Sequence, residues 1–96
     1  MNMVFSDCGR IADDRAQLRH PHPLDIALGA RIRRRRLELG FSQEDLARRI
    51  GIRISQVQRY ELATSTLSFS RLVETAQALN CTVMYLVGDL DKLRMF

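Results

Sequence analysis

Long hydrophobic segments are absent from the sequence. The longest uninterrupted apolar run covers residues 83–87, whereas about 20 apolar residues are needed to cross a bilayer. Asp7 follows soon after Phe5, so the first residues do not form the apolar stretch of a signal peptide either. At 96 residues with 46% hydrophobic side chains, the sequence predicts one small domain with a single core and no contact with a membrane.

Cysteine is scarce as well. Cys8 and Cys81 are the two cysteines, and they form neither a Cys-x-x-Cys pair nor a cluster with histidine. The sequence therefore predicts no disulfide framework and no zinc site. Because such cysteine usage is typical of reducing compartments, we expect a cytoplasmic protein.

Residue patterns that carry out catalysis are missing too. The sequence has no glycine-rich phosphate loop, no His-Glu-x-x-His and no nucleophile paired with a base. Its two histidines, His20 and His22, stand in a proline-interrupted stretch, and two ligands without a third are weak grounds for a metal site. We therefore predict that the chain is not an enzyme and uses no cofactor.

Positive charge is abundant and is concentrated in the middle of the chain. Fourteen of the 15 basic residues are arginine. The segment 31–71 has ten arginines against four acidic residues, a net charge of +6, while the segments before and after it each carry −1. Arginine binds phosphate and guanine edges through two parallel hydrogen bonds. The pattern indicates a surface that binds a polyanion, and a charged helix that merely faces solvent is the alternative.

Hydrophobic periodicity predicts an all-α domain without strands. Ser42, with Asp45 three residues later, forms an approximate capping box at the start of one helix, and Gly51 is suited to end it. Pro23 fits the first turn of the preceding helix, because proline has no amide hydrogen to lose there. The periods and caps together predict five short helices, at about residues 23–39, 42–49, 54–62, 68–80 and 82–87.

Only residues 51–53 separate the second and third predicted helices. Two short helices joined by so brief a turn cross steeply, which is the helix-turn-helix geometry. At about 100° per residue, Val57, Tyr60 and Glu61 lie on the inner side of the third helix, and its outer side is polar. Such a helix fits the major groove of B-DNA, where each base pair presents a distinct pattern of donors and acceptors.

Four polar side chains of the third helix suit the recognition of bases. Arg59 can donate two hydrogen bonds to guanine, and Ser55 can donate or accept. Gln56 or Gln58 can pair with adenine. The alternative is an ordinary hydrated helix face, in which Arg59 pairs with a surface carboxylate. The helix-turn-helix spacing favours the DNA-binding interpretation.

Other polar residues are placed to bind phosphates. Gln43, at the start of the second helix, and Arg53, just before the third, are expected to fix the position of the domain on DNA rather than to read sequence. Residues 33–36 are four consecutive arginines. Because four consecutive residues wrap more than half a helical turn, at most one or two of them can contact a phosphate.

An acidic residue on the inner side of the third helix needs a partner. Glu61 lies beside Val57 on that side, and a buried carboxylate without a positive charge would carry a large desolvation cost. Arg36 on the first helix is our choice of partner. We expect Arg36 and Glu61 to form a structural ion pair.

These patterns resemble a known family. The strings LGARIR at 28–33, GFSQEDLA at 40–47 and QVQRYE at 56–61 resemble the Cro/C1-type, or XRE family, helix-turn-helix repressors, and the resemblance covers about residues 24–88. It implies a five-helix, lambda-repressor-like domain that binds a palindromic operator in double-stranded DNA as a homodimer. It also implies that binding usually represses transcription.

The resemblance assigns roles position by position. The family's phosphate contact falls on Gln43, and its buried Arg–Glu pair falls on Arg36 and Glu61. Its recognition-helix contacts fall on Ile54, Ser55, Gln56 and Arg59. The predicted DNA-binding residues are therefore Gln43, Arg53, Ile54, Ser55, Gln56, Gln58 and Arg59.

The sequence departs from the family at three positions. Arg53 replaces the usual Ser or Thr cap, so the third helix either starts later, with Ser55 as its cap, or exchanges the cap for a phosphate contact. Ala63 replaces the usual glycine, so the turn either avoids the left-handed conformation or bears strain. Ile54 is apolar where a polar reader is common, which favours packing or contact with a thymine methyl group.

The segments on either side of the predicted domain, 23–88, are assigned by composition. Residues 1–22 have scattered charges and no sustained apolar period, which is typical of a flexible leader. Residues 89–96 form a tail that, with the last helix, is predicted to make the dimer contact, and a tail folded onto its own core is the alternative. The apolar residues without an obvious core role are Met84, Tyr85, Leu90, Leu93, Met95 and Phe96.

A second function stays open at this point. The chain is alternatively an antitoxin or an adaptor that binds a protein partner through residues 1–22 or 89–96, and binds DNA together with that partner. Copurification with such a partner would distinguish this role from that of a regulator that acts alone.

Overall fold

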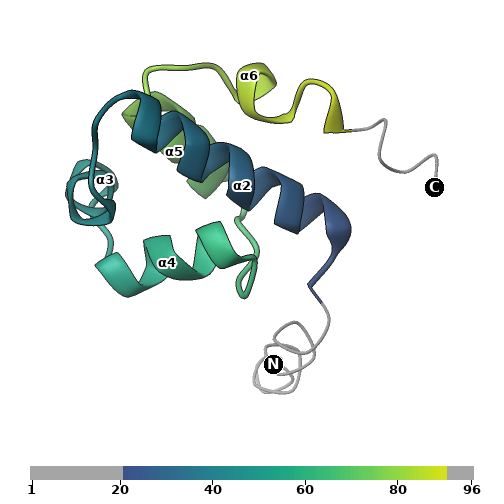
Figure 1. Cartoon of the computed structure of the whole chain (residues 1–96), viewed down its shortest axis with the longest axis horizontal. Helices are drawn as coiled ribbons and strands as arrows, with labels where there is room; N and C mark the ends of the chain where they lie inside the picture. The colour runs from purple at the N-terminus through teal and green to yellow at the C-terminus, as the bar shows by residue number, and fades with distance from the viewer. Residues whose placement is uncertain (1–20, 91–96) are drawn as a thin grey trace, which may run out of the picture.

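The computed structural model describes residues 21–90, which fold as helices joined by short turns (Figure 1). The helices are α2 Pro23–Glu38, α3 Gln43–Ile50, α4 Ile54–Leu62, α5 Phe69–Ala78 and α6 Val83–Val87. Residues 21–90 contain no β-strand. The predicted all-α fold with five helices is therefore confirmed for this part of the chain.

The described part leaves out most of both terminal segments. The predicted leader, 1–22, lies outside it apart from its last two residues, and so do residues 91–96 of the predicted tail. Between these limits, no helix combines the length and the hydropathy of a membrane span.

Polar side chains begin most of the helices. The Ser42 hydroxyl accepts a hydrogen bond from the Asp45 amide at 3.0 Å, and the Asp45 carboxylate accepts one from the Ser42 amide at 2.9 Å, so the capping box of α3 is complete. Gly51 closes α3 with a φ of +85°, a left-handed conformation that glycine adopts without strain. The other side-chain caps are His22 for α2, Ser68 for α5 and Thr82 for α6.

A single apolar core holds these helices together. Helices of 5 to 10 residues, such as α3 to α6, are not stable in isolation, so their stability depends on packing. Leu90 is only 7% exposed, because the turn after α6 brings its side chain against the core. The prediction that Leu90 lacks a core role is therefore wrong. The buried members of the core are Leu28, Ile32, Leu46, Ala47, Val57, Ala76, Leu79, Leu86 and Leu90.

The longest of the described helices, α2, lies in the middle of the arrangement, with α4 on one side and α6 on the other (Figure 1). Gly29 permits a close approach of α2 to α4. A Cβ atom at this position would lie 2.5 Å from the carbonyl oxygen of Tyr60 and 2.7 Å from that of Glu61. Since α3 also packs against α4, α4 is positioned by both neighbouring helices.

Candidate nucleic-acid interface

The turn between α3 and α4 has the expected helix-turn-helix form. Residues 51–53 connect the two helices. In Figure 1, α3 is seen along its axis while α4 runs across the view, so the two helices cross steeply. This crossing places one face of α4 against the rest of the domain and leaves the other face open.

The buried and exposed faces of α4 are the inner and outer sides that helical periodicity predicts. Val57, Tyr60 and Glu61 are buried. Ser55, Gln58 and Arg59 are exposed, and Gln56 is half-buried. Ile54 is 43% exposed and Leu62 is 71% exposed. The outer surface of α4 therefore combines hydrogen-bonding and cationic groups with one apolar residue near each end.

The start of α4 differs from the start of α3. Arg53 occupies the N-cap position of α4 without a capping hydrogen bond from its side chain, and the first turn has no acidic residue. The helix begins at Ile54, so Ser55 lies inside the first turn and is not the cap. The amide groups of this turn and the Arg53 guanidinium both favour an anion nearby.

In α3, by contrast, the N-terminus already has an anion of its own. Hydrogen bonds from the backbone amide and the hydroxyl of Ser42 hold the pKa of Asp45 below its ordinary value. A charged carboxylate at this position also interacts favourably with the helix dipole. The N-terminus of α3 is therefore already paired with a carboxylate of its own helix.

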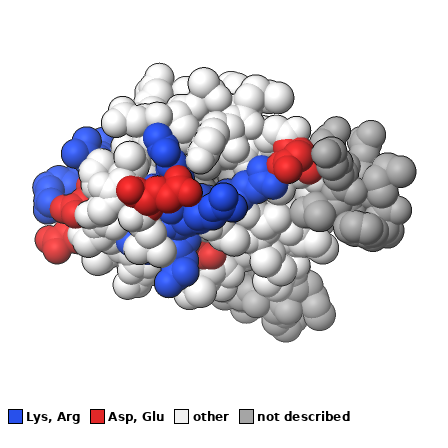
Figure 2. Space-filling view, turned by 45° about the horizontal axis from the view of Figure 1, so that its top comes forward, with Lys and Arg blue, Asp and Glu red and all other residues white. Residues whose placement is uncertain are grey.

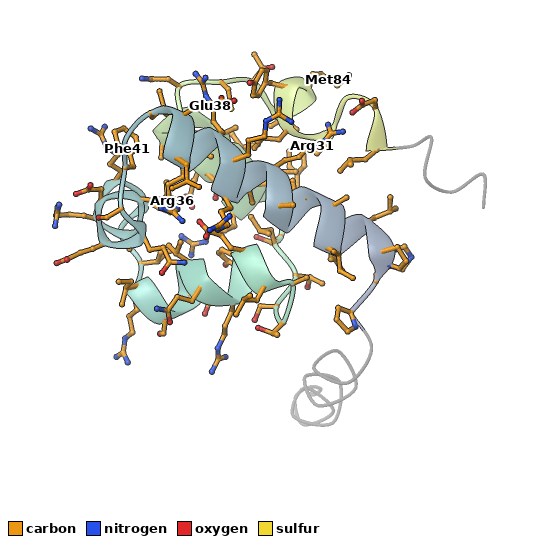
Figure 3. All side chains as sticks on the ribbon, viewed as in Figure 1. Arg31, Arg36, Glu38, Phe41 and Met84 are labelled. Carbon is orange, nitrogen blue, oxygen red and sulfur yellow. The ribbon has the colours of Figure 1, made fainter. Side chains whose placement is uncertain are left out.

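Arg36 and Glu61 form a buried ion pair between α2 and α4. Arg36 Nε donates to Glu61 Oε2 at 2.6 Å, and Nη2 donates to Oε1 at 3.0 Å. The two side chains are 8% and 2% exposed. Arg36 Nη1 also donates to the carbonyl oxygen of Phe41 at 2.8 Å, a partner that sequence analysis did not identify. Figure 3 shows Arg36 between α2, α3 and α4.

Gln43 extends this ion pair towards the surface. Its Nε2 donates to Glu61 Oε1 at 3.1 Å, and its Oε1 accepts a hydrogen bond from Gln58 Nε2 at 3.4 Å. The helical phase of α3 alone could not show these contacts, because they depend on how closely α3 and α4 approach each other. Gln43 is therefore held by a buried carboxylate while it lies beside the exposed face of α4.

The run Arg33 to Arg36 is divided among different roles. Arg36 is buried, and Arg34 pairs with Glu38. Arg35 donates from Nε to the carbonyl oxygen of Leu79 at 3.0 Å and from Nη2 to that of Asn80 at 3.1 Å. A cation at the C-terminal end of α5 is favourable for the helix dipole. Only Arg33 of the four is both exposed and free of a carboxylate partner among residues 21–90.

Six of the ten arginines of segment 31–71 have a neighbouring carboxylate among residues 21–90. On the face that carries α6, arginine and acidic side chains lie next to one another (Figure 2). In contrast, Arg53 and Arg59 of the α4 region have no carboxylate partner within residues 21–90. The arginines of segment 31–71 that do have such a partner are Arg31, Arg34, Arg35, Arg36, Arg48 and Arg71.

The structure also shows what happens at two positions that depart from the family pattern, Ala63 and Ile54. Ala63 adopts a left-handed conformation with a φ of +62°, so the turn after α4 bears the strain that a glycine would avoid. Ile54 borders a shallow hollow beside Ile52. Its partial exposure leaves a methyl-bearing side chain at the start of the outer face of α4.

The described residues offer little for metal binding or redox chemistry. Within residues 21–90, no group of three or more His, Cys, Asp or Glu side chains could hold a metal ion. Cys81 is half-buried, and burial raises the pKa of its thiol. A thiol with a raised pKa is a poorer nucleophile.

Relatives of known sequence are transcriptional regulators. An uncharacterized HTH-type transcriptional regulator of Sinorhizobium medicae is 45% identical over 69 residues, which are 72% of this chain and 50% of that protein. An uncharacterized transcriptional regulator in the ATPase CF(0) region of Rhodospirillum rubrum is 42% identical over 71 residues, 74% of this chain and 66% of that protein. The chain thus spans about half the length of the first of these relatives.

Solved structures of regulators share the fold. The restriction-modification controller protein C.AhdI from Aeromonas hydrophila is 31% identical with a TM-score of 0.62, over 64% of this chain and 92% of that one. The clp gene regulator ClgR from Corynebacterium glutamicum has a TM-score of 0.70 at 21% identity, over 78% of this chain and 80% of that one. A family model described as helix-turn-helix matches residues 32–86. With its open α4 face and a family match over more than half of its length, the chain belongs to the Cro/C1-type, or XRE, helix-turn-helix family of DNA-binding transcriptional regulators.

Proposed function

We propose that the chain binds a specific sequence of double-stranded DNA by inserting α4 into the major groove. The observation that carries this proposal is the division of α4 into two faces. Val57 and Glu61 anchor the inner face, while the outer face presents Ser55, Gln58 and Arg59 to solvent. An α-helix fits the major groove, and these side chain types form hydrogen bonds with base edges.

The proposal gives the remaining interface residues distinct roles. Arg53 and Gln43 contact phosphates on either side of the groove and fix the position of the domain. Arg59 reads guanine, Gln56 and Gln58 read neighbouring bases, and Ile54 contacts a thymine methyl group. This assignment is consistent with Arg53 and Arg59 having no ion-pair partner among the described residues.

We further propose that the chain acts as a homodimer on a palindromic operator. One recognition helix covers only a few base pairs, so useful affinity needs two copies about 34 Å apart along the DNA. In α6, Met84 is 67% exposed and Tyr85 is 53% exposed. A second copy that packs against this apolar face would remove both side chains from water. A dimer bound across a promoter in the cytoplasm would exclude other proteins from the same groove, and the proposed outcome is repression.

The interface assignment predicts different results for a base contact and a phosphate contact. Arg59→Ala should weaken binding to the preferred sequence by about 1–3 kcal/mol and relax the preference at one position. Arg53→Ala should weaken binding to all sequences more evenly and reduce the slope of log affinity against log salt by about one. Fluorescence anisotropy with a duplex from the region upstream of the gene, at several salt concentrations, measures both effects.

A matched control separates these effects from a general change in charge. Arg34 pairs with Glu38 and lines a hollow with Tyr85 of α6, so Arg34→Ala should change the affinity by much less than Arg59→Ala. An affinity that does not depend on salt, or an Arg34→Ala variant as weak as Arg59→Ala, would contradict DNA binding through α4.

The dimer proposal predicts that a charge on α6 separates the two copies. Met84→Glu should raise the dimer dissociation constant by about tenfold or more, since a carboxylate without a partner is costly to bury. Phe69→Glu is the control, because Phe69 is also largely exposed, at 74%, but lies on α5. Sedimentation equilibrium measures the constant, and an unchanged Met84→Glu dimer would rule out α6 as the contact.

A further inference from the structure

The shortest of the described helices, α6, is held against the core by one apolar stripe. Leu86 is buried, and Val83 and Val87 are half-buried beside it. Apolar packing is non-directional, so this stripe keeps α6 on the core without fixing how far the helix is rotated about its own axis. That rotation decides where the exposed side chains of Met84 and Tyr85 point.

Arg31 supplies contacts to α6 that do have a direction. Its side chain extends from α2 into the space between α2 and α6 (Figure 3). Its Nη1 donates to the carbonyl oxygen of Leu86 at 3.3 Å, and its Nη2 forms an ion pair with Asp89, just after the helix. One guanidinium group therefore holds the last turn of α6 together with the turn that follows it.

Arg35, one helical turn further along α2, holds the other end of α6. Its hydrogen bonds to the carbonyl oxygens of Leu79 and Asn80 fix the segment that leads into α6. Its guanidinium carbon also lies 5.3 Å from the centre of the Tyr85 ring, which is a cation–π contact. α6 is thus attached to α2 at both ends, by Arg35 where it begins and by Arg31 where it ends.

The space between these two attachments is a hollow of about 280 Å³. Its lining residues are Arg31, Arg34, Arg35, Glu38, Tyr85 and Asp89. None of them has an aliphatic side chain that would pack against α6 and prevent it from rotating towards the hollow. The directional contacts from α2, rather than packing, therefore fix the rotation of α6.

We propose that Arg31 is a positioning residue that sets the distance between the two half-sites of the operator. The inference rests on the proposed homodimer, in which Met84 and Tyr85 contact the second copy. Because α2 packs against both α4 and α6, a fixed rotation of α6 also fixes where the second copy places its own α4 on the duplex. Two rigidly held recognition helices accept half-sites about one helical turn apart and discriminate against other spacings.

The experiment starts from a palindromic duplex that the wild-type chain selects from random-sequence double-stranded DNA. Wild type and variants are then titrated with this duplex, with duplexes in which base pairs are inserted or removed between the half-sites, and with a single half-site. Arg31→Met keeps most of the length of the side chain but has no donors, and Arg31→Lys keeps the charge with fewer donors. Arg34→Met is the matched control, since Arg34 lines the same hollow but pairs with Glu38 of its own helix.

The expected result is a loss of selectivity for spacing. Arg31→Met should lower the ratio of affinities for the selected and the altered spacings by about fivefold, because the penalty that a rigid α6 imposes cannot exceed the worth of the contacts that hold it, about one hydrogen bond. Arg31→Lys should lie between Arg31→Met and wild type, and Arg34→Met should keep the wild-type ratio. Binding to the single half-site should be unchanged in all of them, since α4 keeps its position.

Thermal unfolding verifies that each variant is folded, and the Arg31→Lys ratio decides if Arg31→Met does not fold. An unchanged spacing ratio in the Arg31 variants would overturn the proposal, even if their binding to the single half-site were weaker. An equal loss of selectivity in Arg34→Met would also overturn it, because the charge of α2 would then be the cause. A wild-type chain that binds the palindrome no more tightly than a single half-site would instead refute the proposed dimer itself.

Discussion

Arg36→Ala is expected to lower the free energy of unfolding by about 3–5 kcal/mol, because it leaves a carboxylate buried without its charge partner. Glu61 is 2% exposed at its side chain and accepts two hydrogen bonds from Arg36. Water cannot easily replace them at this depth. Urea denaturation followed by circular dichroism measures the loss directly.

Two further variants show whether burial is the cause. Arg34→Ala removes the same side chain from the same helix, but Arg34 is 80% exposed and its pair with Glu38 is a surface contact, so the expected loss is below about 1 kcal/mol. A double variant with methionine at both 36 and 61 should recover much of the stability, since an apolar pair carries no desolvation cost. An Arg36→Ala variant as stable as Arg34→Ala would show that the pair contributes little.

Gly29→Val is expected to lower the free energy of unfolding by about 3 kcal/mol, because the new side chain would collide with the backbone of α4. The obstacles are the carbonyl oxygens of Tyr60 and Glu61, at 2.5 and 2.7 Å from an added Cβ atom. A backbone atom cannot rotate away as a flexible side chain can, so α2 and α4 must separate. The same displacement would move α4 relative to α3, and DNA binding should weaken as well.

Ala30→Val provides the comparison for this substitution. Ala30 is the next residue of α2 and is exposed, so valine there meets no neighbouring helix and only lowers helix propensity, at a cost of less than about 1 kcal/mol. Urea midpoints of the two variants give the difference. Equal losses at the two positions would contradict the close contact between α2 and α4.

The sequence was sufficient for features that depend on one helix at a time. Ser42 and Asp45 stand three residues apart, so their capping box could be predicted from local spacing. The inner position of Glu61 followed from the helical phase of α4, and its charge required a cation. The resemblance to the repressor family then predicted the fold, and it predicted which helix would face DNA.

Most contacts between different helices could not be predicted from the sequence. Arg35 caps the end of α5, and Gln43 bonds to Glu61, yet nothing in their own helices distinguishes these side chains from solvent-facing ones. Leu90 appeared to lack a core role because one apolar residue after a glycine has no period to place it. Each of these outcomes depends on the distance between helices far apart in sequence, which spacing along one helix does not determine.

The uneven pairing of arginines has a consequence for the encounter with a duplex. Acidic neighbours offset the positive charge on the α6 side, whereas Arg53 and Arg59 leave the α4 side with an excess. A diffusing molecule with such an asymmetric charge distribution experiences a torque in the field of a polyanion, and turns its cationic side towards it before contact. A larger fraction of collisions then occurs in a productive orientation. The association rate therefore rises even where the final affinity is set by other groups.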